Sequence, residues 1–151
     1  MVKRPKRTDG IDPAARSRSR RRAVQALYAW QMSGSAMDAI IDQFRHEQDM
    51  QVADLAYFED LLKGVDREHA GIDEALKPWL DRPIEEVDPL ERAVLRMAGY
   101  ELKFRTDVPY RVVLNEAIEA AKRFGTDFGH TYVNGVLDHA AAAWRGSEYG
   151  A

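Results

Sequence analysis

Apolar residues recur along this chain at spacings of three and four, a period that predicts α-helices from about residue 12 onward. The sustained alternation of apolar and polar residues that indicates half-buried strands is missing from the sequence. Asp12 and Pro13 have the character of an N-cap and a first helical residue. The first helix is therefore expected to run from about Pro13 to Met32 and to end at Ser33 and Gly34. The pattern predicts an all-α fold.

Capping residues, prolines and glycines place the other expected helices. We predict helix starts near residues 35, 54, 89, 108 and 127, and the last four helices should end near residues 77, 104, 125 and 146. Ser35 and Asp38 resemble a capping box for the second helix, and a break is expected near Gly71 in the third. Gly99 lies in the middle of the fourth helix. Packing of a neighbouring helix is the commoner reason for such a glycine, and close approach of a partner is the alternative.

Length and composition indicate one domain of ordinary size. The chain has 151 residues, 45% of them hydrophobic, which is enough to bury a core without disulfide or metal staples. We expect a disordered basic leader over residues 1–12, one helical domain over 13–146 and a flexible tail over 147–151. There is no cysteine, and neither a secretory signal nor a spanning helix is recognisable, so we expect a cytoplasmic protein.

Positive charge is concentrated at the start of the first helix. Residues 1–22 hold nine Lys and Arg against two Asp, whereas the rest of the chain is acidic. Five of these cations fall within seven positions: Arg16, Arg18, Arg20, Arg21 and Arg22. Cations near the N-terminus of a helix are destabilising, because that end of the helix dipole is positive. A bound polyanion would offset this repulsion. The run therefore favours nucleic acid as a partner, with a solubilising tail or an anionic membrane surface as alternatives.

No constellation for catalysis or metal binding is recognisable. The four histidines lack ligand spacing, and no phosphate loop, nucleophile elbow or dinucleotide fingerprint is present. Glu116 and Glu119 lie three apart, but nearby Lys122 and Arg123 indicate a solvated, salt-bridged surface. We therefore predict a binding protein that is not an enzyme and needs no cofactor.

Aromatic residues near the cations suggest base stacking, which commonly holds single-stranded RNA. Tyr28 lies two turns after Arg21, and Phe124, Phe128 and Tyr132 flank the turn at Gly125. Aromatics at such spacings are more often core residues. Phe128, which precedes Gly129 directly, has the least core-like position of the three.

Several segments in order resemble the NusB transcription antitermination family. Arg22 to Gln31, with the sequence RAVQALYAWQ, resembles the family's opening, and Leu90 to Arg96 with Tyr100-Glu101-Leu102 is similar to its central helix. The C-terminal signature is matched by DVPY at 107–110, NEAIE at 115–119, FG at 124–125 and VNGVLD at 133–138. The resemblance covers about residues 15 to 145. It implies about seven helices in two packed bundles and no catalytic activity.

The resemblance also implies partners and site residues. Family members bind boxA RNA of nascent transcripts, notably of ribosomal RNA operons, together with the ribosomal protein NusE in an RNA polymerase antitermination complex. By motif position the RNA-binding residues would be Arg16, Arg18, Arg20, Arg22, Gln25, Tyr28, Phe124 and Tyr132, with Arg96 nearby. The arginine run and the aromatic pattern add Arg21 and Phe128 to this set. The partner-binding residues would be Glu91, Arg96 and Tyr100. Some members self-associate, and the sequence leaves monomer and homodimer open.

The rival interpretations belong to other functional classes. The helical domain of RNA cytosine methyltransferases looks alike, although no methyltransferase domain follows Ala151. A basic arm would also suit a DNA-binding architectural protein. A structural or ribosome-assembly factor, with an arm that serves only solubility, is the third alternative. Phe128 and Gly129 stand where polar residues are common in the family, and the long basic leader has no assigned role.

Overall fold

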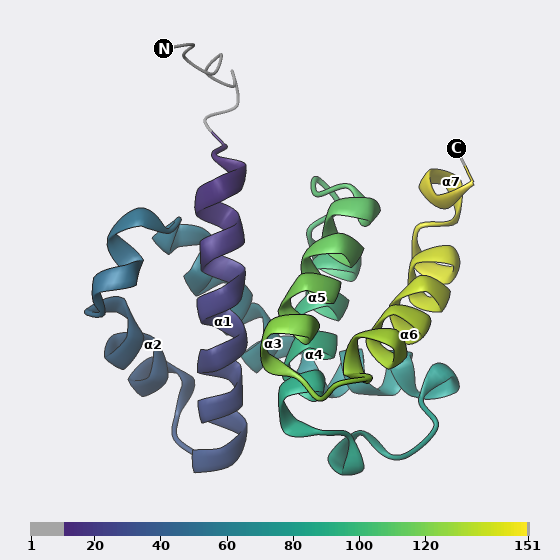
Figure 1. Cartoon of the computed structure of the whole chain (residues 1–151), viewed down its shortest axis with the longest axis horizontal. Helices are drawn as coiled ribbons and strands as arrows, with labels where there is room; N and C mark the ends of the chain where they lie inside the picture. Colours follow the sequence, from purple (N-terminus) through teal and green to yellow (C-terminus); the bar gives the residue numbers. More distant parts are fainter. Residues whose placement is uncertain (1–10, 151) are drawn as a thin grey trace.

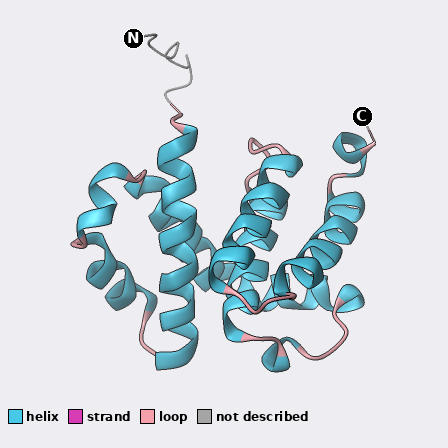
Figure 2. Ribbon diagram, viewed as in Figure 1, coloured by secondary structure: helices cyan, strands magenta, loops and turns pink. Residues whose placement is uncertain are grey.

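The structure is a computed structural model that describes residues 11–150, and every regular element within that range is helical (Figures 1 and 2). Seven α-helices and three short 3₁₀ helices occur in this order: α1 (Pro13–Ser33), α2 (Met37–Arg45), η1 (Gln48–Val52), α3 (Leu55–Leu76), η2 (Lys77–Trp79), η3 (Ile84–Glu86), α4 (Pro89–Phe104), α5 (Tyr110–Phe124), α6 (Gly129–Trp144) and α7 (Gly146–Tyr149). The predicted all-α class is confirmed.

Helix α4 joins two packed halves. It contacts α1 and α3 on one side and α5 and α6 on the other, so α1–α3 and α4–α6 form the two bundles that the resemblance implied (Figure 1). Ten of the residues of α4 are buried, in keeping with this central position. Helix α5 also contacts α1 directly, and this contact brings the cationic helix beside the second bundle.

Side-chain caps explain where several helices begin. Asp12 Oδ1 accepts hydrogen bonds from the backbone N–H groups of Ala14 and Ala15 at 3.0 and 3.3 Å, as the sequence predicted. Asp54 and Asp88 cap α3 and α4 in the same manner. Gly34 ends α1 in the left-handed region with φ of 69°, a conformation that favours glycine.

Three predictions about the elements were wrong. Helix α2 begins at Met37 after an Ala36 cap that makes no side-chain hydrogen bond, so the expected capping box is not formed. Helix α3 passes through Gly71 without a break. The expected flexible tail forms the short helix α7 instead. The predicted leader lies outside the described residues, apart from Ile11 and Asp12.

Two glycines allow α3 and α4 to pack closely. A Cβ added at Gly99 would lie 2.7 Å from Ile72 Cγ2, and one at Gly64 would lie 2.1 Å from the ring of Tyr100. Gly99 therefore serves helix packing and not the approach of a partner, which settles the choice left open by the sequence. No helix within residues 11–150 combines the length and apolar character that crossing a membrane requires.

Candidate nucleic-acid interface

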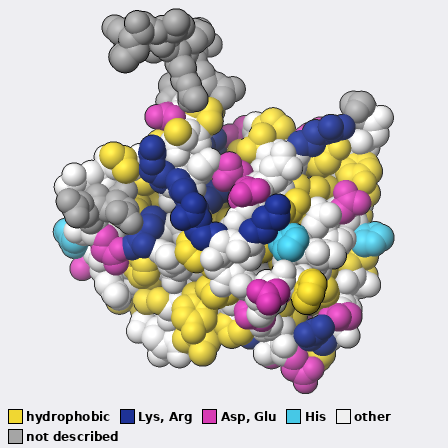
Figure 3. Space-filling model, in the orientation of Figure 1, with side chains coloured by type: hydrophobic (Ala, Val, Ile, Leu, Met, Phe, Trp, Pro, Cys, Tyr) yellow, Lys and Arg dark blue, Asp and Glu magenta, His cyan; other side chains and the backbone are white. Residues whose placement is uncertain are grey.

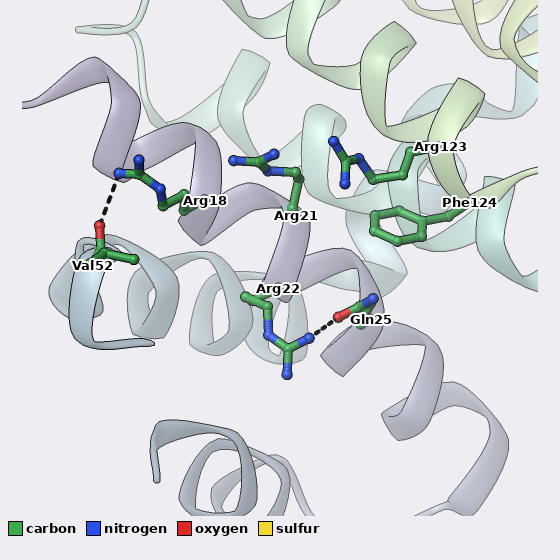
Figure 4. A pocket seen from close by; sticks show the side chains of 7 residues that line it. All are labelled: Arg18, Arg21, Arg22, Gln25, Val52, Arg123 and Phe124. Carbon is green, nitrogen blue, oxygen red and sulfur yellow. Dashed lines mark hydrogen bonds between the residues drawn. The ribbon is translucent and has the colours of Figure 1, made fainter. Parts of the chain in front are cut away.

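The helical period of α1 separates its cations into two rows. Arg18, Arg21, Arg22 and Gln25 recur at three and four residues and face a shallow cavity of about 300 Å³. Val52 of η1 and Arg123 and Phe124 of α5 complete its lining, so three separate elements contribute (Figure 4). We call this cavity, with its seven lining residues, the arginine pocket. In Figure 3 the basic side chains gather on this face between α1 and α5.

Intramolecular contacts occupy some arginine-pocket cations and leave others available. Arg18 Nη1 donates to the carbonyl oxygen of Val52 at 3.3 Å, and Arg22 donates to the Gln25 side-chain oxygen (Figure 4). Arg22 also forms an ion pair with Glu47. By contrast, the guanidinium groups of Arg21 and Arg123 form no hydrogen bond or ion pair with any residue in the described part of the chain. Both also line a neighbouring cavity of about 230 Å³. An anion entering the pocket would therefore find two guanidinium groups that are not engaged in an ion pair.

Arg20 does not line the arginine pocket, although it lines the neighbouring cavity of about 230 Å³, and its contact with RNA stays a prediction. Only 3% of Arg20 is exposed. Its Nε and Nη2 donate to the Glu101 carboxylate on α4 at 2.9–3.1 Å, and the Tyr57 hydroxyl donates to the same carboxylate. Burial opposes the charged form, but the Glu101 carboxylate outweighs it and raises the pKa of Arg20.

Arg16 is also turned toward α3. Its Nε lies 3.7 Å from Asp54 Oδ2, and its guanidinium lies 4.1 Å from the centre of the Tyr57 ring. The arginines of this run therefore fall into two groups, one that packs against other helices and one that lines the pocket. Arg16 and Arg20 face the protein, whereas Arg18, Arg21 and Arg22 face the pocket.

Three other predicted residues meet in a second cavity, which we call the Phe128 pocket. Glu91, Phe128 and Tyr132 line it, together with Asp81, Arg82, Val87, Asp88, Thr126 and Gly129. Phe128 is 82% exposed, so its ring is accessible to a ligand. The Arg82 guanidinium lies 5.5 Å from the centre of the Tyr132 ring. The Phe128 pocket therefore presents an exposed ring beside charged groups of both signs.

Glu91 is held at the floor of the Phe128 pocket. Its side chain is buried, and Thr126 Oγ1 donates to Glu91 Oε1 at 3.1 Å. Gly129 leaves the room that this carboxylate needs, because a Cβ there would lie 2.0 Å from Glu91 Oε1. Burial raises the pKa of Glu91. A charge reversal at Glu91 would therefore disturb the fold as well as any partner contact.

The remaining predicted residues are not brought to either pocket. Tyr28 is exposed on α1 beyond the arginine pocket. Arg96 is paired with Asp73 at 2.8 Å and with Gln31 at 3.1 Å. Tyr100 is only 3% exposed and donates to Asp60 Oδ1 at 2.9 Å. Tyr100 therefore presents little surface in the free chain, and its role as a partner-binding residue stays a prediction.

Sequence reasoning missed Arg123, Ser17 and Ser19. Arg123 looked like part of a salt-bridged surface, and only Lys122 has such a pair, with Glu119 at 3.9 Å. The adjacency of Arg123 to Phe124 at the end of a helix was the available signal. Ser17 and Ser19 alternate with arginines, and a count of charges identifies this segment only as basic.

Comparisons with known proteins agree with this architecture. The NusB family model matches residues 17–142. The transcription antitermination protein NusB of Stenotrophomonas maltophilia strain K279a is 67% identical over 147 residues, which cover 97% of this chain and 92% of that protein. The protein of the same name from Xanthomonas axonopodis pv. citri strain 306 is 66% identical over 145 residues, covering 96% and 91%.

Solved structures show the same fold. Thermotoga maritima NusB superposes with a TM-score of 0.76 at 29% identity, over 89% of this chain and 97% of that one. A chain in a crystal structure of the antitermination factors NusB and NusE with double-stranded RNA gives a TM-score of 0.71 at 22% identity, over 85% and 96%. The family match and the high identity of its relatives lead to one conclusion: this chain belongs to the NusB family of transcription antitermination proteins.

Proposed function

We propose that this protein binds single-stranded boxA RNA of nascent transcripts, as a heterodimer with the ribosomal protein NusE, within an RNA polymerase antitermination complex. The observation that carries the RNA part is the pair Arg21 and Arg123. Their guanidinium groups come from two helices, line one cavity and have no anionic partner among residues 11–150. Phosphate is the ligand that such groups recognise in nucleic acids.

Aromatic side chains support a single strand over a duplex. Phe124 lies in the arginine pocket beside Arg123, and Phe128 is exposed at the other end of the α5–α6 turn. Bases stack on such rings when they are not paired, whereas paired bases in a helix are closed to them. A strand with its phosphates on Arg21 and Arg123 and its bases on these rings would use both kinds of contact.

The Phe128 pocket is the candidate surface for NusE. It adjoins the end of the same α5–α6 turn, so a partner there would lie next to the RNA. A solved complex of NusB and NusE with RNA contains a chain of the same fold, which supports this choice of partner. Catalysis is not part of the proposal, since neither pocket holds an activated nucleophile or a recognisable acid and base pair.

The test is RNA binding by fluorescence anisotropy with a boxA-like RNA, a scrambled RNA and a duplex DNA of equal length, each with and without NusE. Preference for boxA RNA that strengthens with NusE is expected. Equal binding to all three nucleic acids in both conditions would contradict the proposal and favour a DNA-binding architectural protein. Absence of phosphate-dependent binding would favour a structural assembly factor.

A further inference from the structure

We infer that Arg20 is a positioning residue, which fixes α1 so that its neighbours face RNA, and that it never contacts RNA itself. The inference rests on the proposed function. Arg20 lies four residues before Val24 and seven before Leu27, two residues that are fully buried. It therefore belongs to the docking face of α1, about 100° around the helix from Arg21.

The contacts of Arg20 form a closed network across three helices. Nε of Arg20 lies 3.0 Å from Glu101 Oε1, and Nη2 lies 2.9 Å from Glu101 Oε2. Tyr57 of α3 donates its hydroxyl hydrogen to the same carboxylate. The guanidinium of Arg105, from the end of α4, lies 4.8 Å from the centre of the Tyr57 ring. The bidentate hydrogen bonding between Arg20 and Glu101 fixes the relative orientation of the two side chains as well as their distance.

Two serines anchor the same turns of α1. Ser19 Oγ donates to the carbonyl oxygen of Asp54 at 2.6 Å, and Ser17 Oγ donates to Glu116 Oε1 of α5 at 2.7 Å. Arg20, Ser19 and Ser17 thus tie α1 to α4, to the start of α3 and to α5. With these ties in place, Arg18, Arg21 and Arg22 are left on the side that lines the arginine pocket.

This arrangement separates two roles within a single basic run. A residue that contacts phosphate contributes to the salt dependence of binding, because it releases counterions when RNA binds. A residue that holds α1 in place changes the fraction of molecules with a formed pocket and leaves the number of phosphate contacts unchanged. If only a tenth of the molecules keep α1 docked, the apparent affinity falls about tenfold.

The experiment compares Arg20→Met with the triple variant Arg20→Met, Tyr57→Phe, Glu101→Leu. The single variant leaves the buried Glu101 carboxylate without a cation, whereas the triple variant replaces the whole network by apolar groups, a change that folded proteins often tolerate. Anisotropy across a salt titration gives affinity and slope for boxA RNA, and circular dichroism reports folding.

We expect about tenfold weaker binding for the single variant and recovery toward the wild-type affinity for the triple variant, with a wild-type salt slope. A folded triple variant that stays weak, with a slope flatter by about 0.7, would overturn the inference, because a phosphate contact would then be missing. A wild-type protein that shows no preference for boxA RNA would instead contradict the proposed function.

If the triple variant does not fold, Glu101→Gln tests the positioning role of Arg20 instead. This change keeps the charge of Arg20 and weakens its anchor. Weaker RNA binding at an unchanged slope is expected. Equal or tighter binding would overturn the inference, since a released Arg20 would then serve RNA. Glu74→Gln, at an exposed position of α3, is the matched control for the loss of one negative charge.

Discussion

Arg145 Nη1 donates a hydrogen bond of 2.9 Å to Glu148 Oε1, and this pair clasps the turn between α4 and α5. The Arg145 guanidinium also donates to four backbone carbonyls at 2.8–3.1 Å, those of Glu101, Leu102, Arg105 and Val108. Glu148 Oε2 accepts from the backbone N–H of Tyr110 at 2.7 Å, where α5 has no side-chain cap of its own. Arg145, at the junction of α6 and α7, and Glu148 of α7 therefore supply both caps of this turn.

Arg145→Met is expected to destabilise the protein by about 3 kcal/mol, because buried carbonyls lose a charged donor and have no replacement. Arg145 is only 7% exposed, so water cannot easily substitute for it. Urea unfolding followed by circular dichroism gives the free energy. Arg67→Met, at an exposed site, is the control and should stay within about 0.5 kcal/mol of wild type. An equal loss of unfolding free energy in both variants would contradict a stabilising role for the Arg145 hydrogen bonds.

The clasp also predicts a pH dependence. The hydrogen bond from the Tyr110 backbone N–H lowers the pKa of Glu148 below its ordinary 4.5. The folded state thus holds the proton less tightly than the unfolded chain, so the stabilisation is complete above pH 4.5 and is lost as the pH falls through the lowered pKa. Glu148→Gln should therefore lower the melting temperature near neutral pH and approach wild type in acid. A difference that stays constant with pH would argue against an ionic role.

Two glycines in α3 should respond to alanine in opposite ways. Gly71 has open space around it, so Gly71→Ala should stabilise the protein by about 0.5–1 kcal/mol through helix propensity. Gly64→Ala would press a methyl group into the ring of Tyr100, and overpacking of this kind costs about 1–3 kcal/mol. Thermal unfolding of the two variants tests the close approach of α3 and α4. Stabilisation by both substitutions would refute it.

Glu91→Gln is expected to raise the melting temperature at neutral and alkaline pH. Burial raises the pKa of Glu91, so the folded state holds its proton more tightly, and stability falls as the pH rises through the raised pKa. Gln keeps an oxygen that can accept from Thr126 and carries no charge. The gain should vanish below pH 4.5, where the carboxyl is protonated in both states. Glu74→Gln, at an exposed position, should show no such profile.

The fold was largely predictable because periodicity and caps act locally. Asp12, Asp54 and Asp88 signalled helix starts that the structure contains. Ser35 and Asp38 failed as a capping box, since that motif also occurs without forming a cap. The tail was missed because α7 is held by long-range contacts such as the hydrogen bond from the Tyr110 backbone N–H to Glu148 Oε2, at 2.7 Å, which no short pattern encodes.

The candidate site was predictable only in part. Composition located the arginine run, and helical spacing could have separated Arg20 from Arg21, but the partner of Arg20 lies 81 positions away in Glu101. Likewise, the second half of the arginine pocket comes from Arg123 and Phe124, which reach α1 only through the packing of α5. The tertiary structure therefore determines which arginines are accessible to a ligand.

The salt dependence of boxA RNA binding by the double variant Arg21→Gln, Arg123→Gln tests the central claim most directly. These two groups have no partner among the described residues, so their loss should leave the fold intact and remove two phosphate contacts. We predict a slope of log affinity against log salt that is flatter by about 1.4, or about 0.7 for each contact, while Arg67→Gln keeps the wild-type slope. A double variant with the wild-type slope and affinity would contradict the claim that this pocket holds RNA.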